Sequence, residues 1–200
     1  MLTRLRELEI KMLEKKSFLE FTKRISFSLG FASLVGLSTH LKIFLPWSPV
    51  PITAQTFFVL LGGILLGKFW GGIAELIYVG LGSIGLQWFA GGNILGPTGG
   101  YLIGFVLAGF FLGYVVEVYK PKGLLNIFFL MLLANFFLIY IPGILYLGFY
   151  LSTIKGSFPG IYQLLLMGLF PFIPGDLIKI SFASIIASVF IKRKNFSNKT

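Results

Sequence analysis

An aspartate and a lysine stand close together in an otherwise apolar stretch near the C-terminus. Asp176 and Lys179 are three residues apart, so a helix places both side chains on one face. A charge at the centre of a bilayer costs about 2.5–3.5 kcal/mol on insertion scales, and intramembrane charges usually serve a function. The pair therefore either neutralises itself as a structural ion pair or meets a polar ligand, and the second interpretation is favoured.

A second group of polar residues lies between two long apolar runs. It runs from residue 94 to Tyr101 and contains the turn sequence Gly-Pro-Thr-Gly-Gly at 96–100. Irregular backbone is tolerated near hydrocarbon only where protein or water satisfies its polar groups, so such a segment usually lines a cavity. These residues therefore indicate a binding site for a ligand.

Two glycine-rich runs imitate nucleotide-binding motifs without the necessary context. The run at 62–69 resembles a phosphate loop, but Phe69 stands where a serine or threonine holds magnesium. The run at 80–85 resembles a dinucleotide fingerprint, but neither a preceding strand nor an acidic residue about 20 positions later accompanies it. The sequence also offers no nucleophile–base pair or metal cluster, and it contains no cysteine. We therefore expect neither an enzyme nor a protein that hydrolyses ATP.

The composition indicates a chain that lies in a membrane. Of its 200 residues, 56% are hydrophobic and 12% are charged, whereas about 25% are charged in soluble domains.

Apolar runs predict helices near 25–45, 54–67, 69–89, 99–118, 124–149 and 174–191. The second is short for a bilayer, which needs about 20 residues. Prolines interrupt a further apolar segment at 161–173, so we interpret it as a loop or half-helix leading into the last span. If this segment crossed the membrane completely, the chain would have seven spans.

The basic residues predict six spans with both termini in the cytoplasm. Seven lysines and arginines precede residue 25, and four follow residue 191. Because such residues are retained on the cytoplasmic side, the number of spans must be even. The chain then divides into a charged N-terminal extension at 1–24, a membrane domain at 25–191 and a basic tail at 192–200. The extension is either a membrane-surface helix or a solvated tail. These features predict an all-α membrane protein.

Small residues form a stripe on the predicted first span. Ser28, Ala32 and Gly36 fall four apart and allow a second helix to approach closely. That helix belongs either to the same bundle or to a partner subunit, and both alternatives stay open. Glu75, near the cytoplasmic end of the third predicted helix, is interpreted as a structural residue.

Four segments in combination resemble the signature of the BioY family. They are Pro-Val-Pro-Ile-Thr-Ala-Gln-Thr at 49–56, Phe-Ala-Gly-Gly-Asn at 89–93, the glycine-rich run at 96–105, and Pro-Gly-Asp-Leu-Ile-Lys at 174–179. The resemblance implies a biotin-specific substrate-binding (S) subunit of an energy-coupling-factor (ECF) transporter, a six-helix bundle in the bacterial plasma membrane. It also implies three partners besides lipid: a transmembrane coupling subunit and two ATPase subunits. No cofactor and no nucleic-acid partner are expected.

The resemblance also points to residues that suit biotin, which offers a cyclic urea, an apolar thioether ring and a carboxylate. Asp176 can accept hydrogen bonds from the urea N–H groups, and Asn93 can donate and accept. Lys179 can donate to the urea carbonyl or to the carboxylate. The remaining substrate-binding candidates are a glutamine and four aromatic residues: Gln55, Tyr101, Trp47, Trp88 and Phe89. The two tryptophans fit a membrane interface equally well.

These expectations combine into one mechanism with two open alternatives. The chain captures biotin from outside, in a pocket covered by loop 46–54 and bounded by 90–98, and an ATP-driven module releases it inward. One alternative is a solitary biotin transporter that works without an ATPase. The other is an S subunit for a different vitamin.

Overall fold

A computed structural model describes residues 2–156 and 158–197, with side chains described for 15–154, 156 and 158–192. The first half of the chain contains α1 (Leu2–Ser38), a hairpin of β1 (Lys42–Leu45) and β2 (Ser48–Thr53), α2 (Gln55–Leu66), α3 (Trp70–Ser83) and α4 (Gly99–Tyr119). The second half contains α5 (Leu124–Leu133), the π-helical turn η1 (Ala134–Ile139), α6 (Tyr140–Lys155), α7 (Ile161–Gly168), the 3-10 turn η2 (Phe170–Phe172) and α8 (Ile173–Ser197).

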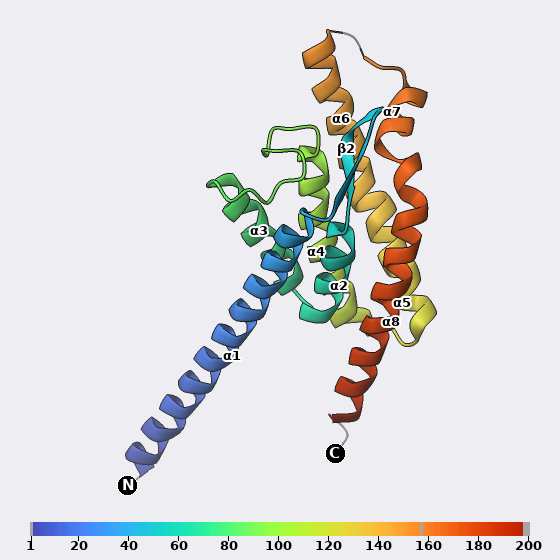
Figure 1. The fold of residues 1–200 in the computed structure, drawn as a ribbon. Helices are drawn as coiled ribbons and strands as arrows, with labels where there is room; N and C mark the ends of the chain where they lie inside the picture. Colours follow the sequence, from blue (N-terminus) through green and yellow to red (C-terminus); the bar gives the residue numbers. More distant parts are fainter. Residues whose placement is uncertain (1, 157, 198–200) are drawn as a thin grey trace.

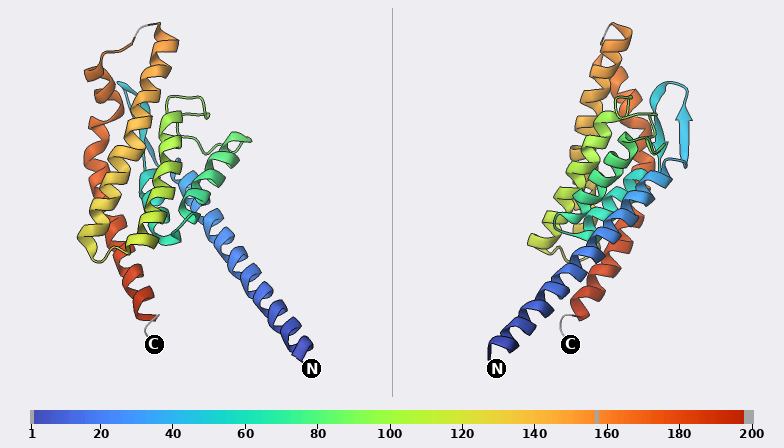
Figure 2. Two further views of the ribbon diagram at one scale, coloured as in Figure 1. Left: turned by 180° about the vertical axis from the view of Figure 1, so that it is seen from behind. Right: turned by 90° about the vertical axis from the view of Figure 1, so that its left-hand side faces the viewer.

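The helices form one elongated bundle (Figure 1). Helix α4 packs against α2, α3 and α6, while α8 closes the bundle against α2 and α5. The first half of α1 extends away from the other helices, and α1 begins at the same end of the molecule at which α8 ends (Figures 1 and 2). The hairpin lies beside the bundle, where β2 contacts α7.

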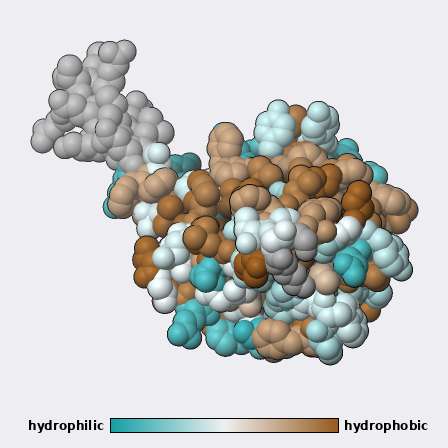
Figure 3. All heavy atoms as spheres, turned by 90° about the horizontal axis from the view of Figure 1, so that it is seen from above, coloured by the Kyte–Doolittle hydropathy of each residue, from teal (hydrophilic) through white to brown (hydrophobic). Residues whose placement is uncertain are grey.

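Within the described residues, three helices are long and apolar enough to cross a membrane. They are Gly99–Tyr119, Leu124–Ile154 and Ile161–Lys192. Helices α2 and α3 have 12 and 14 residues. At about 1.5 Å per residue they extend roughly 20 Å, which is less than the bilayer core of about 30 Å. Large apolar side chains remain exposed on the bundle, as lipid contact requires, and hydrophobic residues spread across the end view in Figure 3.

The first two connections differ from the prediction. The first helix was expected to reach residue 45, but α1 ends at Ser38, and residues 42–45 form a strand instead. Lys42 pairs with Thr53 and Ile43 with Ile52 in the antiparallel hairpin, so the fold is not purely helical. The third helix was expected to reach residue 89, but α3 ends at Ser83. Gly85 follows with φ +119°, a conformation that glycine adopts without a steric penalty.

The C-terminal half agrees more closely with the prediction. The expected helix at 124–149 is present and runs on to Lys155 through the π turn. The interpretation of 161–173 as a half-helix leading into the last span is confirmed, since α7 and η2 lead directly into α8. At the other end of the chain, α1 runs without a break across residue 24.

The stripe of small residues on α1 faces the chain's own helices. Ser28 and Ala32 are fully buried, and the Ser28 hydroxyl donates to the Trp70 carbonyl at 3.2 Å. A Cβ atom on Gly36 would collide with the ring of Trp88. The structure therefore supports packing within the bundle, and it does not support the alternative in which this stripe faces a partner subunit. Glu75 is also buried in the bundle, with 1% of its surface exposed.

Three glycines let α2, α3 and α4 meet with almost no space between their backbones. A Cβ atom on Gly71 would lie 2.7 Å from the Gly63 Cα and 2.8 Å from the Gly109 carbonyl oxygen. Both neighbours are backbone atoms, so neither can move without shifting a helix. Close approach of this kind drives helix association in lipid, where the hydrophobic effect contributes little.

We expect Gly71→Ala to destabilise the protein by about 1–3 kcal/mol through overpacking. Thermal unfolding in detergent, followed by helical circular dichroism, measures the effect. Gly80→Ala is the matched control, because it makes the same change in the same helix where no atom lies within 4 Å. Equal melting temperatures for the two variants would contradict the close contact.

Candidate functional site

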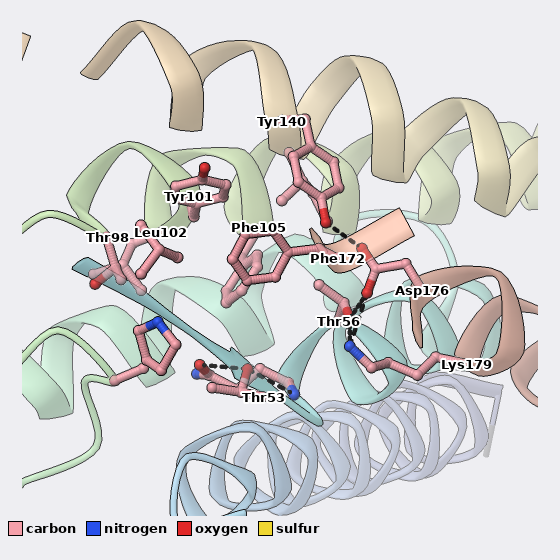
Figure 4. A pocket seen from close by; sticks show the side chains of 15 residues that line it. Thr53, Thr56, Thr98, Tyr101, Leu102, Phe105, Tyr140, Phe172, Asp176 and Lys179 are labelled. Carbon is pink, nitrogen blue, oxygen red and sulfur yellow. Dashed lines mark hydrogen bonds and ion pairs between the residues drawn. The ribbon is translucent and has the colours of Figure 1, made fainter. Parts of the chain in front are cut away.

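A cavity of about 50 Å³ lies between the hairpin and the helices. Its walls come from widely separated segments: β2, the start of α2, the irregular segment between α3 and α4, the start of α4, the junction of η1 with α6, the turn η2 and the start of α8. Figure 4 shows that the lining is mixed. Phe105, Phe172 and Leu102 supply apolar surface, while Asp176 and Lys179 supply charge. Such a lining suits a ligand with an apolar body and one strongly polar group.

Asp176 is the centre of a hydrogen-bonded cluster and is 1% exposed. Its Oδ1 accepts from Lys179 Nζ at 2.7 Å and from the Thr56 hydroxyl at 3.2 Å. Its Oδ2 accepts from the Tyr140 hydroxyl at 2.5 Å and from Asn135 Nδ2 at 2.9 Å. Four donors match the acceptor capacity of an ionised carboxylate. In Figure 4, Tyr140 approaches Asp176 from one side and Lys179 from the other.

Lys179 completes the charge balance of the cavity. Its side chain is 19% exposed, and Nζ donates to the Thr56 hydroxyl at 3.2 Å as well as to Asp176. The lysine and the aspartate neutralise each other, which lowers the cost of two charges within an apolar bundle. An ammonium group has three donors, so one remains for a ligand acceptor.

Gln55 is buried at the edge of the cavity and held by hydrogen bonds at both ends of its amide. Its Nε2 donates to the Tyr78 hydroxyl at 2.7 Å, and its Oε1 accepts from the Thr53 hydroxyl at 3.2 Å. Tyr78 in turn donates to the Trp88 carbonyl at 3.0 Å. These bonds tie β2 and α2 to the segment that follows α3, so they fix one wall of the cavity.

Four of the substrate-binding candidates from the sequence line the cavity: Asp176, Lys179, Gln55 and Tyr101. Tyr101 is buried, and its hydroxyl donates to the Gly168 carbonyl at 2.7 Å, which ties the start of α4 to α7 beside the cavity.

The other four candidates are not among the residues that line the cavity. Trp47 is 57% exposed in the hairpin turn, and Trp88 packs over Gly36. Phe89 is buried in an edge-to-face contact with Tyr78 at 5.8 Å between ring centroids. Asn93 is exposed on the irregular segment between α3 and α4. The expected meeting of Asn93 with the charged pair is therefore corrected, because the amide on Asp176 belongs to Asn135.

Sequence reasoning missed three residues that contact Asp176: Thr56, Asn135 and Tyr140. A signal was available for Asn135, which is an amide in the middle of a long apolar run. Polar residues in such runs usually face the interior of a bundle and bind one another. Thr56 is the last residue of the signature segment at 49–56, but its residue type alone did not predict a role in the site.

The fold and the site define a class of protein. A bundle of apolar helices encloses a small, partly polar cavity near a hairpin, and the Asp176–Lys179 ion pair in this cavity can orient a polar ligand. This is the arrangement of a ligand-binding membrane subunit.

The chain belongs to the BioY family, whose sequence model matches residues 9–195. It is 42% identical over 145 residues to a probable biotin transporter BioY of Methanothermobacter thermautotrophicus, covering 70% of this chain and 92% of that protein. It is 39% identical over 168 residues to the biotin transporter BioY of Thermotoga maritima, covering 78% and 89%. It also resembles the crystal structure of the S-component for biotin from an ECF-type ABC transporter, with a TM-score of 0.74, 27% identity, and coverage of 86% and 93%.

Proposed function

We propose that this chain is a membrane subunit that binds biotin for uptake. The observation that carries the proposal is the Asp176–Lys179 pair in the cavity of a BioY-family bundle. A cyclic urea has two N–H donors on either side of one carbonyl acceptor. Asp176 and Lys179 offer the matching acceptor and donor, 2.7 Å apart. The relatives named biotin transporters and the similar S-component for biotin support the same ligand.

Each charged residue has a role in the proposed binding of biotin. Lys179 donates its remaining N–H to the urea carbonyl. Asp176 Oδ1 accepts from one urea N–H, which takes the place of the long 3.2 Å bond from Thr56. The aromatic and aliphatic residues around Phe105 cover the thioether ring. Ligands without the urea pattern leave these groups unpaired, at a cost of about 1–3 kcal/mol for each buried group.

The orientation in the membrane follows from charge and length. The chain crosses the plasma membrane six times with both ends in the cytoplasm, and the short α2 and α3 span a locally thinned or protein-lined region. In Figure 1, α1 begins and α8 ends at the same end of the bundle, which supports an even number of crossings. Neither glycine-rich run, at 62–69 or at 80–85, has the context of a nucleotide site. The energy for release therefore comes from partners, and a transmembrane coupling subunit with two ATPase subunits empties the site.

Titrating the purified chain in nanodiscs with biotin tests the proposal. We expect saturable binding of one biotin per chain, which desthiobiotin displaces and which thiamine and riboflavin do not. Binding of thiamine or riboflavin in place of biotin would contradict the proposed ligand. Uptake by cells that produce this chain with and without the coupling module separates ATP-driven transport from a solitary transporter.

Lys179→Met should weaken biotin binding about 10- to 150-fold, because hydrogen bonds to charged groups contribute about 1.5–3 kcal/mol. The change keeps the length of the side chain and removes its charge and donors. Lys122→Met is the control, since Lys122 is exposed in the connection between α4 and α5. Equal affinities in isothermal titration calorimetry for the two variants would rule out the role assigned to Lys179.

A further inference from the structure

The π turn η1 brings two side chains to the same oxygen atom. Asn135 Nδ2 and the Tyr140 hydroxyl both donate to Asp176 Oδ2, at 2.9 Å and 2.5 Å. The two residues are five apart in sequence. In a regular α-helix, at 3.6 residues per turn, residues five apart point about 140° away from each other. The wider π turn, with its i→i+5 hydrogen bonds, returns them to one face.

The sequence around η1 explains why the helix widens here. Pro142 has no N–H, and a proline ring clashes with the carbonyl four residues earlier, which belongs to Leu138. The widened backbone needs space, and α4 supplies it with glycine. A Cβ atom on Gly104 would lie 2.5 Å from the Ile139 Cα and 2.7 Å from the Leu138 oxygen. Pro142 therefore disfavours a regular α-helix at this turn, and Gly104 leaves the space that the wider turn occupies.

The two oxygens of Asp176 face different surroundings. Oδ2 contacts Asn135, which is fully buried and is not among the cavity-lining residues, and Tyr140, which is 4% exposed and lines the cavity. Oδ1 contacts Thr56 and Lys179, which both line the cavity. Oδ2 is thus held by two donors from a single turn of the bundle, whereas both partners of Oδ1 line the cavity.

We propose that Asn135 and Tyr140, brought together by the π turn, are positioning residues that fix Asp176 Oδ2 and so hold Oδ1 in place for the polar ring of the ligand. This inference rests on the proposed function and assigns roles to residues that contact the ligand-binding carboxylate. Precise recognition requires that a binding group be locked by a supporting shell of hydrogen bonds, because a loosely held group loses affinity without losing the fold.

Tyr140→Phe removes the hydroxyl and keeps the packing of the ring. The ring stacks on Phe136 at 5.5 Å and meets Tyr101 edge-on at 5.9 Å, and phenylalanine preserves both contacts. Asn135→Leu removes the second donor at similar volume. Tyr146→Phe is the matched control, because the Tyr146 hydroxyl donates to the Leu95 carbonyl in an exposed position.

The first measurement compares biotin affinity with unliganded stability in detergent. Tyr140→Phe and Asn135→Leu should each weaken biotin binding about tenfold or more, as expected for a lost hydrogen bond to a charged group. Each variant loses a hydrogen bond to a buried carboxylate, so its melting temperature without biotin should fall below that of Tyr146→Phe, and the affinities are compared at a temperature at which all three variants are folded. Parental affinity in both variants would overturn the inference, and so would a loss of affinity that only follows a loss of stability.

Infrared spectroscopy of the carboxylate supplies a readout that packing alone does not change. The sequence has only seven aspartates and glutamates, so subtracting the spectrum of Asp176→Asn identifies the Asp176 band. This band should move in Tyr140→Phe and Asn135→Leu and stay in place in Tyr146→Phe. An unmoved band in both variants would overturn the inference.

The two proposals fail in different ways. If the unsubstituted protein binds no biotin, the proposed function fails, and the positioning role falls with it. If the unsubstituted protein binds biotin and both variants bind it equally well, only the positioning role fails.

Discussion

The Asp176→Ala protein should bind biotin at least about 30-fold more weakly than the parental chain. The substitution removes the acceptor for the urea N–H and leaves four donors without this partner: Thr56, Lys179, Asn135 and Tyr140. Removing one member of a desolvated, hydrogen-bonded charge pair costs about 2–5 kcal/mol in binding, or roughly 30- to 5,000-fold in affinity. Equilibrium binding of labelled biotin to the purified variant measures the loss.

Removing the aspartate alone should destabilise the protein more than removing both charges of the pair does. Breaking a buried pair leaves an uncompensated charge and costs about 3–5 kcal/mol, whereas replacing both partners with apolar residues is often close to neutral. We therefore expect Asp176→Leu/Lys179→Leu to melt at a higher temperature than Asp176→Leu alone, although neither binds biotin.

Asp176→Asn separates charge from shape, since it keeps the size of the side chain and one acceptor oxygen. It should fold and should bind biotin far more weakly than the parental chain. Normal biotin binding by both Asp176→Ala and Asp176→Asn would show that this carboxylate is not part of the site.

Local spacing was sufficient to predict the charged half of the site. Asp176 and Lys179 share a face of α8 because residues three apart on a helix always do, whatever surrounds them. Gln55 begins α2 one residue after β2, and Tyr101 lies in the first turn of α4 after the irregular segment 84–98, and such helix starts are visible in sequence. Their place at the cavity therefore followed from local rules combined with the family resemblance.

The position of Asn93 depends on the path of an irregular segment, which no periodic pattern describes. Residues 84–98 contain glycines with positive φ at 85 and 92, and their turns direct the chain in ways that composition does not reveal. Asn93 consequently lies exposed, although its residue type and the resemblance both favoured a place in the site.

Asn135 and Tyr140 were missed for a different reason. Helical periodicity places residues five apart on different faces, and only the π turn brings them together on Asp176. The hairpin was missed because short apolar runs, such as residues 42–45, cannot be assigned to helix or strand by periodicity alone. Long apolar runs carried no such ambiguity, so α4 and the helices at 124–155 were predicted well.

The hairpin should control access to the cavity. Val50, Pro51 and Thr53 of β2 line it, and the Ser48 hydroxyl donates to the Met167 carbonyl at 2.5 Å, which fastens the hairpin to α7. The cavity of about 50 Å³ is much smaller than ligand pockets in general, which measure about 300 Å³ or more. A ligand with two fused rings and a tail can enter only if a wall moves. The hairpin is the wall that consists of two strands rather than packed helices.

Joining the hairpin to α7 should therefore block biotin binding almost completely. The sequence contains no cysteine, so Ser48→Cys/Met167→Cys introduces the only two thiols, and a short bismaleimide or a disulfide can link them. Ile43→Cys/Ile52→Cys is the matched control, because these residues pair across the hairpin and a link between them leaves the hairpin free to move as a unit. We expect the linked 48–167 protein to bind no biotin, the disulfide form to recover on reduction, and the linked control to bind normally. Normal association of biotin with the linked 48–167 protein would mean that the ligand enters through another wall.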